Sequence, residues 1–181
     1  MRRYCNLLFV LLFFSGCAVT PVSVSKHKTM QLSQMLQSLG NDISVKESLS
    51  LSHNIFHHTS KLTKKFKLTS PPIFHNFLVN VGAREKGLCY HWSDALYEYL
   101  SKKEYFSFEF HLVGANIGEY FFEHNALVVT AKKGDLVNAV LIDPWRDSGK
   151  LYFSKVKDDK KYQWFHRPSR GCNKQQLGAT Y

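Results

Sequence analysis

A cysteine stands at the front edge of a predicted helix in the stretch KGLCYHWSDALYEYL, where Gly87 breaks the chain two residues before Cys89. The face of this helix predicted to be buried consists of Trp92, Ala95, Leu96, Tyr99 and Leu100. In the first turn of a helix the backbone N–H groups lack intrahelical partners, and the helix dipole favours negative charge. We therefore expect the Cys89 thiol to ionise readily, and the thiolate is the nucleophilic form of cysteine.

A thiolate nucleophile also needs a base, and the base must come from another part of the chain. His91 follows Cys89 by two residues, which places it about 200° around a helix of 3.6 residues per turn. Asp94, five residues on, lies about 140° away by the same geometry. Neither side chain is expected to reach the sulfur.

Two later segments, HNALVVTA and LVNAVLID, predict a β-hairpin that supplies the base. A turn centred between Lys133 and Gly134 places His124 directly opposite Asp143. Cross-strand neighbours have Cβ atoms about 4.5–5.5 Å apart, so the carboxylate can hold the imidazole in one tautomer.

Together these residues predict a triad with Cys89 as nucleophile, His124 as general base and then acid, and Asp143 as the orienting carboxylate. A register shifted by one residue would put His124 and Asp143 on opposite faces of the sheet. The alternative for His124 is an ordinary strand histidine, either exposed or hydrogen-bonded.

Helical periodicity dominates the chain before Cys89. The inward-facing apolar residues are predicted to be Leu32, Met35, Leu36 and Leu39 in a first helix, Leu51, Ile55, Leu62 and Phe66 in a second, and Phe74, Phe77, Leu78 and Val81 in a third. Ser44 and Glu47 form a capping box that opens the second helix, and Pro71-Pro72 opens the third. His53, His57 and His58 lack a carboxylate or cysteine at ligand spacing, which disfavours a metal site.

Strand periodicity dominates the chain after the Cys89 helix. Phe106, Phe108, Phe110 and Leu112 alternate with polar residues, which predicts a half-buried strand. A glycine-containing loop is expected at 114–119, and Pro144 is expected to end the second hairpin strand, because proline cannot continue a central ladder. A last strand is expected at 151–156. The predicted class is α+β, with N-terminal helices and a Cys-bearing helix packed on an antiparallel sheet.

The first 16 residues predict a signal peptide. Arg2 and Arg3 precede an apolar run too short to span a membrane. The run ends in Phe14-Ser15-Gly16-Cys17, which resembles a bacterial lipobox and implies cleavage before Cys17 and attachment of lipid to its sulfur. The alternatives are an ordinary signal peptide or an uncleaved anchor. We expect a signal peptide at 1–16, a lipidated tether at 17–28 and a single domain at 29–181.

Composition limits the partners of the exported chain. Removal of residues 1–16 leaves 165 residues and lowers the formal net charge from +10 to +8. This surplus favours anionic partners such as lipid headgroups, cell-wall polymers or acidic peptides. Nucleic acid is disfavoured, because the address is extracytoplasmic and no nucleic-acid-binding motif is found. Cys89 and Cys172 are the thiols left for the domain, and a disulfide between them is the alternative to a reactive Cys89.

The order of the three motifs, Cys in GLCYHWSDAL, His in HNALVV and Asp in VLIDPW, resembles the transglutaminase-like branch of the papain-like cysteine enzymes. The resemblance covers about residues 84–146. It implies the same roles for Cys89, His124 and Asp143, and an oxyanion hole that uses the Cys89 backbone N–H and a side-chain donor, for which Arg84 is one candidate. Asn125 stands where family members commonly have tryptophan.

The sequence therefore predicts a lipid-anchored cell-envelope enzyme, a cysteine peptidase or acyltransferase acting on amide bonds of a protein or peptide substrate. No metal or organic cofactor is required by this chemistry. Ala18 after the lipobox cysteine favours the outer membrane, facing the periplasm, as the location. One alternative is a non-catalytic scaffold lipoprotein with a degenerate site. Another is a basic domain that binds anionic glycans or lipids.

Overall fold

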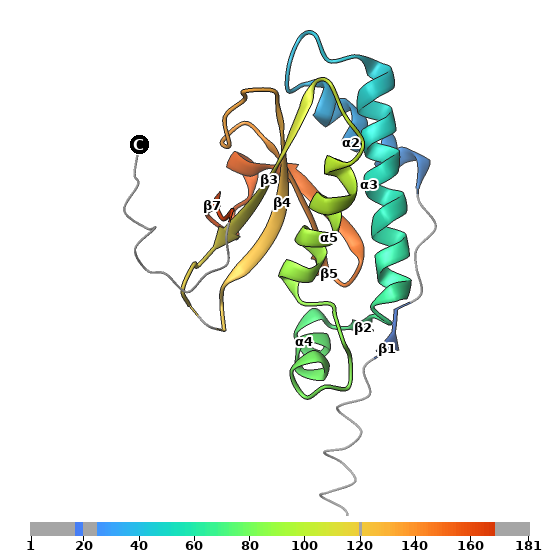
Figure 1. Ribbon diagram of the computed structural model, residues 1–181, viewed down its shortest axis with the longest axis vertical. Coiled ribbons are helices and arrows are strands. Elements are labelled where there is room, and N and C mark those ends of the chain that lie inside the picture. The colour runs from blue at the N-terminus through green and yellow to red at the C-terminus, as the bar shows by residue number, and fades with distance from the viewer. Residues whose placement is uncertain (1–16, 20–24, 120, 169–181) are drawn as a thin grey trace, which may run out of the picture.

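The computed structural model describes residues 17–19, 25–119 and 121–168, which form helices on one side of an antiparallel sheet (Figure 1). The helices are α2 (Lys26–Gln37), α3 (Val45–Lys65), α4 (Pro72–Asn80), α5 (Cys89–Ser101) and the short 3₁₀ helix η1 (Val156–Asp158). The strands are β1 (Cys17–Ala18), β2 (Thr69–Ser70), β3 (Phe108–Ala115), β4 (His124–Ala131), β5 (Val140–Asp147), β6 (Lys150–Lys155) and β7 (Phe165–His166).

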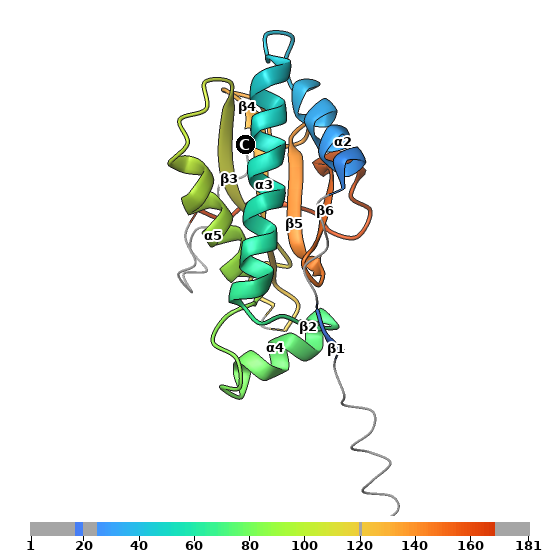
Figure 2. The same ribbon diagram turned by 90° about the vertical axis from the view of Figure 1, so that its right-hand side faces the viewer.

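The main sheet has five strands in the order β6-β5-β4-β3-β7, and every neighbouring pair is antiparallel. β1 and β2 form a separate two-stranded pair. Helices α2, α3 and α5 lie on one side of the main sheet, as the side view shows (Figure 2). The predicted α+β class is therefore confirmed at the level of four α-helices and an antiparallel five-stranded sheet in the described part of the chain.

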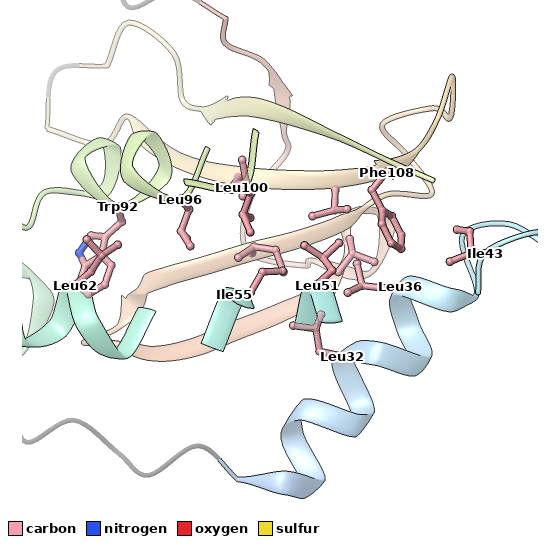
Figure 3. Close-up of a cluster of buried hydrophobic side chains, with 14 of the residues drawn as sticks. Leu32, Leu36, Ile43, Leu51, Ile55, Leu62, Trp92, Leu96, Leu100 and Phe108 are labelled. Atoms are coloured by element: carbon pink, nitrogen blue, oxygen red, sulfur yellow. The ribbon is translucent and has the colours of Figure 1, made fainter. Parts of the chain in front are cut away.

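Apolar side chains of the helices meet those of β4 and β5 in a first core cluster (Figure 3). Leu51 and Ile55 of α3 and Leu96 of α5 are completely buried in it. The predicted capping box is half formed: the Ser44 hydroxyl accepts the backbone N–H of Glu47, while the Glu47 carboxylate bonds to Ser107 instead. The core fixes α5, and so the position of its first residue, against the strands.

A second apolar cluster lies on the other face of the sheet. Its buried members are Val113, Ala115, Ala126, Val128, Ala139, Leu141 and Trp164. Trp164 reaches this cluster from the segment after β6, so the C-terminal part of the described chain covers the face that the helices leave open. Both faces of β4 are buried, which explains its nearly unbroken apolar sequence.

The register of the β4–β5 hairpin differs from the predicted one by two residues. Leu127 pairs with Ile142 and Val129 with Val140; extended by one residue, this register would bring Asp143 towards Ala126 instead of His124. The difference arises in the connection between β4 and β5. There the Asp135 carboxylate accepts hydrogen bonds from Asn138, and these bonds form a turn in addition to the predicted turn at Lys133 and Gly134. A shift of two residues preserves the face to which each side chain points, because strand side chains alternate with a period of two.

Three predicted strand boundaries were also wrong. β5 continues through Pro144 to Asp147, but it pairs with β4 only as far as Ile142, so the proline lies where that ladder has already ended. β3 extends to Ala115 and therefore includes the start of the expected loop. Phe106 precedes β3 and is 83% exposed, so it does not belong to the predicted alternation.

The orientation predicted for the third helix, α4, was wrong for two residues. Phe77 and Val81 were expected to face inward, and they are 55% and 58% exposed. The reason is that α4 packs at the end of the fold through His75, which is completely buried. A polar side chain therefore occupies the position at which the apolar pattern predicted the core.

The segment expected to be a tether differs from the prediction at both ends. Cys17 and Ala18 pair with Ser70 and Thr69, and α2 already begins at Lys26. Residues 1–16, predicted to be a signal peptide, and the side chain of Cys17 lie outside the described part of the chain. Among the residues that the structure describes, none of the helices combines the length and the apolar composition that crossing a bilayer requires.

Candidate active site

Cys89 is the first residue of α5, at the edge of the buried region, with 9% of its surface exposed. The chain approaches it through Gly87, whose backbone φ of +134° is one that L side chains rarely adopt. A Cβ at Gly87 would also overlap the imidazole ring of His75. His75 in turn is held on both ring nitrogens, since Nδ1 accepts the Thr69 N–H and Nε2 donates to the Lys86 carbonyl.

His124 and Asp143 are in direct contact. His124 Nε2 donates to Asp143 Oδ2 over 2.7 Å, and both side chains are buried, with 3% and 1% of their surface exposed. The contact lies just beyond the β4–β5 ladder, which ends at the Leu127–Ile142 pair: His124 is the first residue of β4, and Asp143 follows Ile142 on β5. With Nε2 engaged, Nδ1 is the ring nitrogen left for a reacting group.

The environment of His124 favours its protonated form. Burial by itself lowers the pKa of His124, but the hydrogen bond to Asp143 and the interaction with Cys89 outweigh burial and raise the pKa to about 9. Within the described residues, His124 Nδ1 has no partner in hydrogen-bonding geometry. Cys89 is nevertheless near enough to contribute to the raised pKa of His124. An imidazolium at neutral pH, next to a sulfur, is the arrangement that stabilises a thiolate.

The Cys89 sulfur lies against the beginning of β4. Its S–H points to the Glu123 carbonyl at 4.0 Å, and Asn125 Nδ2 donates to Sγ at 3.9 Å. Asn125 is buried, and its Nδ2 also bonds to the Glu123 carboxylate at 3.4 Å, which fixes the direction of the amide. Asn125 thus contacts the candidate nucleophile.

Arg146 contacts the same Asp143 carboxylate as His124, and both side chains donate to Oδ2. Its Nε donates to Asp143 Oδ2 over 3.0 Å and its backbone N–H donates to Oδ1 over 3.2 Å. The rest of the guanidinium makes two hydrogen bonds to Asp159, of 3.1 and 2.7 Å. Burial opposes ionisation of Asp159, but its bonds to Arg146 and to Trp164 lower its pKa to about 2. Asp143 therefore lies between His124 and a guanidinium group that Asp159 holds in place.

Aromatic rings surround the His124 imidazole. The ring centroids of Trp145, Tyr162 and Trp164 lie 4.7, 4.8 and 5.4 Å from that of His124. Trp145 is anchored by a hydrogen bond from its indole N–H to Asn76 of α4, over 3.0 Å. These rings limit the access of water to the His124–Asp143 pair and keep the imidazole in one orientation.

The structure thus brings the predicted Cys89, His124 and Asp143 to one end of the sheet. His91, which helical geometry excluded as the base, accepts the backbone N–H groups of Gly87 and Leu88 through Nδ1. Arg84, the candidate second oxyanion donor, instead bonds to the carbonyls of Lys67 and Ala83.

Other predicted positions lie apart from this site or outside the described residues. His58 stacks on the ring of Tyr99, with centroids 4.0 Å apart. No cluster of three His, Cys, Asp or Glu side chains that could hold a metal ion occurs in the described part of the chain. Cys172 lies outside the described residues.

Sequence reasoning missed Asn125, Arg146 and Asp159. Arg146 was given no role in the site, yet its side chain is only 9% exposed and bonds to Asp143. Its position three residues after Asp143 was the signal that could have indicated the ion pair, whereas Asp159 lies in a weakly patterned segment that offered none. Asn125 was noticed only as a departure from the family pattern.

Comparisons of the chain with profiles of protein families, with curated proteins and with solved structures found no match.

Proposed function

We propose that this protein is a lipid-anchored cell-envelope cysteine enzyme that acts on amide bonds, related to the transglutaminase-like branch of the papain-like enzymes. The observation that carries the proposal is the 2.7 Å hydrogen bond from His124 Nε2 to Asp143 Oδ2, with Nδ1 left for the thiol at the start of α5. A base held by a carboxylate next to a nucleophile is the functional unit of a catalytic triad.

The proposed reaction begins with a Cys89 thiolate and a His124 imidazolium. The sulfur attacks the carbonyl carbon of an amide, and the π electrons of the carbonyl move to its oxygen. As the C–N bond breaks, His124 Nδ1 gives its proton to the leaving amine, and a thioester on Cys89 remains. Water, or a second amine, then attacks the thioester while His124 takes the proton from this nucleophile, which releases the acid or the new amide and restores the thiolate–imidazolium pair.

Asn125 is proposed to supply the side-chain donor of the oxyanion hole. Its Nδ2, 3.9 Å from the sulfur, is close enough to bond an oxygen on a carbon attached to that sulfur. The second donor is the backbone N–H of Cys89, in the first turn of α5, where N–H groups lack intrahelical partners. Donors fixed before the reaction stabilise the developing charge without reorganisation.

The order of the motifs along the chain and the arrangement of the elements both support the proposed relationship. The Cys begins a helix, the His begins a strand and the Asp lies on the next strand. The proposed lipid on Cys17 places the enzyme at the membrane, and Ala18 favours the periplasmic side of the outer membrane.

Two small reagents test the chemistry without knowledge of the substrate. Iodoacetamide alkylates a thiolate by direct displacement, whereas 4-nitrophenyl acetate acylates it through a tetrahedral intermediate. We expect both reagents to modify Cys89 of the full chain rapidly near neutral pH. Cys89→Ala should fold normally and lose this rapid modification, so that only the slow reaction of the other thiols remains. His124→Gln should slow the reaction of both reagents with Cys89 about 100-fold, in the range of general acid–base catalysis.

Asn125→Ala tests the contribution of the oxyanion hole independently of the nucleophile. We expect it to retain the alkylation rate and to lose about 100-fold in acylation, the typical effect of removing one oxyanion donor. Asn54→Ala, which removes an amide that bonds Tyr105 away from the site, is the matched control. Unchanged labelling of Cys89→Ala, or a Cys89–Cys172 disulfide in the purified chain, would favour a non-catalytic scaffold.

A further inference from the structure

Large apolar side chains line the solvent-facing side of α4. Ile73, Phe77 and Val81 are 69%, 55% and 58% exposed. Their spacing of four residues places them in one row along the helix and its C-terminal cap. On the inner side, the completely buried His75 fixes the helix to the fold. A contiguous exposed row of this kind marks an interaction surface, whereas scattered apolar residues do not.

Exposed cations occupy the chain segments that precede and follow α4. Lys64 and Lys65 end α3, Lys67 precedes β2, and Lys86 precedes α5; all four side chains are exposed. Residues 59–84 contain no Asp or Glu, and Glu85 is the first acidic residue after them. The surface therefore combines apolar residues with positive charge, which is the composition of interfacial helices on anionic membranes.

The same end of the molecule holds the point at which the chain joins the domain. β1 pairs with β2, Cys17 opposite Ser70, and β2 leads directly into α4. Both views show β1, β2 and α4 together at one end, with the first turn of α5 pointing towards them (Figures 1 and 2). Whatever holds Cys17 therefore also brings α4 close to it.

We propose that the α4 surface, defined as Ile73, Phe77 and Val81 with the flanking Lys64, Lys65, Lys67 and Lys86, docks on a bilayer that contains anionic lipids. The proposal rests on the lipid anchor included in the proposed function. The α4 residues enter the interfacial region, the lysines contact headgroup phosphates, and the anchor supplies a second attachment.

Docking in this orientation has a consequence for the substrate of the proposed enzyme. α4 contacts the site through Asn76, which holds Trp145 beside His124, and through His75, which holds the backbone before Gly87. The Cys89 end of α5 therefore lies close to the membrane surface. The substrate class that this placement favours is an amide of a peptide or protein held at that surface.

Tryptophan quenching in vesicles tests the docking with a matched pair of variants. Phe77→Trp and Phe106→Trp replace exposed phenylalanines, the first on α4 and the second before β3 at the opposite end of the sheet. The full chain is reconstituted in phosphatidylglycerol-containing vesicles with doxyl-labelled phosphatidylcholine. We expect strong quenching of the added tryptophan in Phe77→Trp, and quenching in Phe106→Trp no greater than in the parent chain.

Charge reversal tests the cationic part of the surface. In the Phe77→Trp background, Lys64→Glu/Lys65→Glu should reduce the quenching at least twofold, and 0.5 M salt should have the same effect. Lys102→Glu/Lys103→Glu, the equivalent pair at the end of α5, should leave it unchanged. Purely zwitterionic vesicles should give weaker quenching than anionic ones.

The result that overturns the proposal is equal quenching of Phe77→Trp and Phe106→Trp. If the α4 surface were instead covered by a second copy of the chain, quenching would be absent and Phe77→Ser would abolish a dimer seen by ultracentrifugation. Cys89→Ala in the Phe77→Trp chain separates this inference from the enzymatic one, because quenching is expected to persist when the thiol chemistry is lost.

Discussion

The His124 imidazole is buried among aromatic rings, yet it is expected to carry a charge at neutral pH. Two neighbours account for this: the Asp143 carboxylate at 2.7 Å and the Cys89 sulfur, which together raise the pKa to about 9 despite the cost of burial. The proton is thus already on the group that would deliver it to a leaving amine.

This raised pKa predicts how stability depends on pH. A histidine whose pKa rises from 6.5 to about 9 on folding stabilises the fold fully below pH 6.5 and loses that contribution as pH rises through 9. We expect the free energy of unfolding to fall by about 3 kcal/mol between pH 6.5 and 9.5. Urea denaturation of the full chain measures this change.

Two variants make the assignment to His124 specific. His124→Gln should remove most of the decline above pH 6.5. His58→Gln should retain it, because burial lowers the pKa of His58 and its titration falls below this range. A decline of the same size in His124→Gln would assign the effect to another group.

Arg146 is predicted to be a positioning residue for Asp143 and a large contributor to stability. Arg146→Ala leaves the buried Asp159 without its cation and Asp143 with His124 alone, which costs about 3–5 kcal/mol. Arg146→Lys keeps the charge but loses the forked contact to both carboxylates, so it should rescue only part of the loss. Lys102→Ala, which breaks an exposed ion pair with Glu98, is the control and should leave the unfolding midpoint almost unchanged.

At the scale of elements, the turn before α5 determines where the thiol lies. Gly87 has a φ of +134°, and the His75 ring fills the space that a side chain would need. The conformation of the turn and the position of the His75 ring therefore depend on each other. Together they link α4 to the first residue of α5. A change in this contact is expected to move Cys89 relative to β4.

Gly87→Ala tests this link. Strained backbone and the contact with His75 should together destabilise the fold by about 3 kcal/mol and slow alkylation of Cys89. Gly82→Ala is the control, since Gly82 also has a positive φ of +78° but a Cβ there would have nothing within 4 Å, so it should cost only about 1 kcal/mol. In a Gly87→Ala/His75→Ala chain the two losses of stability should be less than additive, because His75→Ala removes the ring that the new Cβ at position 87 would overlap. Additive losses would show that the turn and His75 are independent.

The element scale also shows what periodicity could and could not predict. The positions of α3 and α5 followed from apolar spacing, because both helices bury a regular stripe. The juxtaposition of His124 and Asp143 was expected for a register two residues from the observed one, and the side chains still meet because the shift preserves their face.

Side chains that break the apolar pattern account for what could not be predicted. α4 is attached through the buried His75, so its apolar row faces solvent although the same row would mark a core face elsewhere. Arg146 and Asp159 pair across 13 positions, and no periodicity encodes such a contact. The oxyanion role proposed for Asn125 likewise depends on a distance to Cys89 that only the folded chain provides.

At the scale of the whole molecule, three features gather at one end. These are the β1–β2 pair that receives the chain from Cys17, the apolar and cationic surface of α4, and the first turn of α5 with Cys89. An enzyme attached by a lipid at this end would work on substrates at the membrane and not at a distance from it. The short connection allows little freedom, because Cys17 itself is the first residue of β1.

This arrangement depends on lipid being attached at Cys17, which the lipobox resemblance predicts and labelling can test. Cells that express the full chain are grown with radioactive palmitate, and the purified protein is examined for label. Cys17→Ser should lose the label and the cleavage of residues 1–16, because the sulfur is the atom that carries the lipid. Cys5→Ser is the matched control: it removes a cysteine from the predicted signal peptide, and labelling should be unchanged. Label retained by Cys17→Ser, or lost from Cys5→Ser, would show that the anchor is elsewhere and would leave docking by α4 as the only attachment at this end.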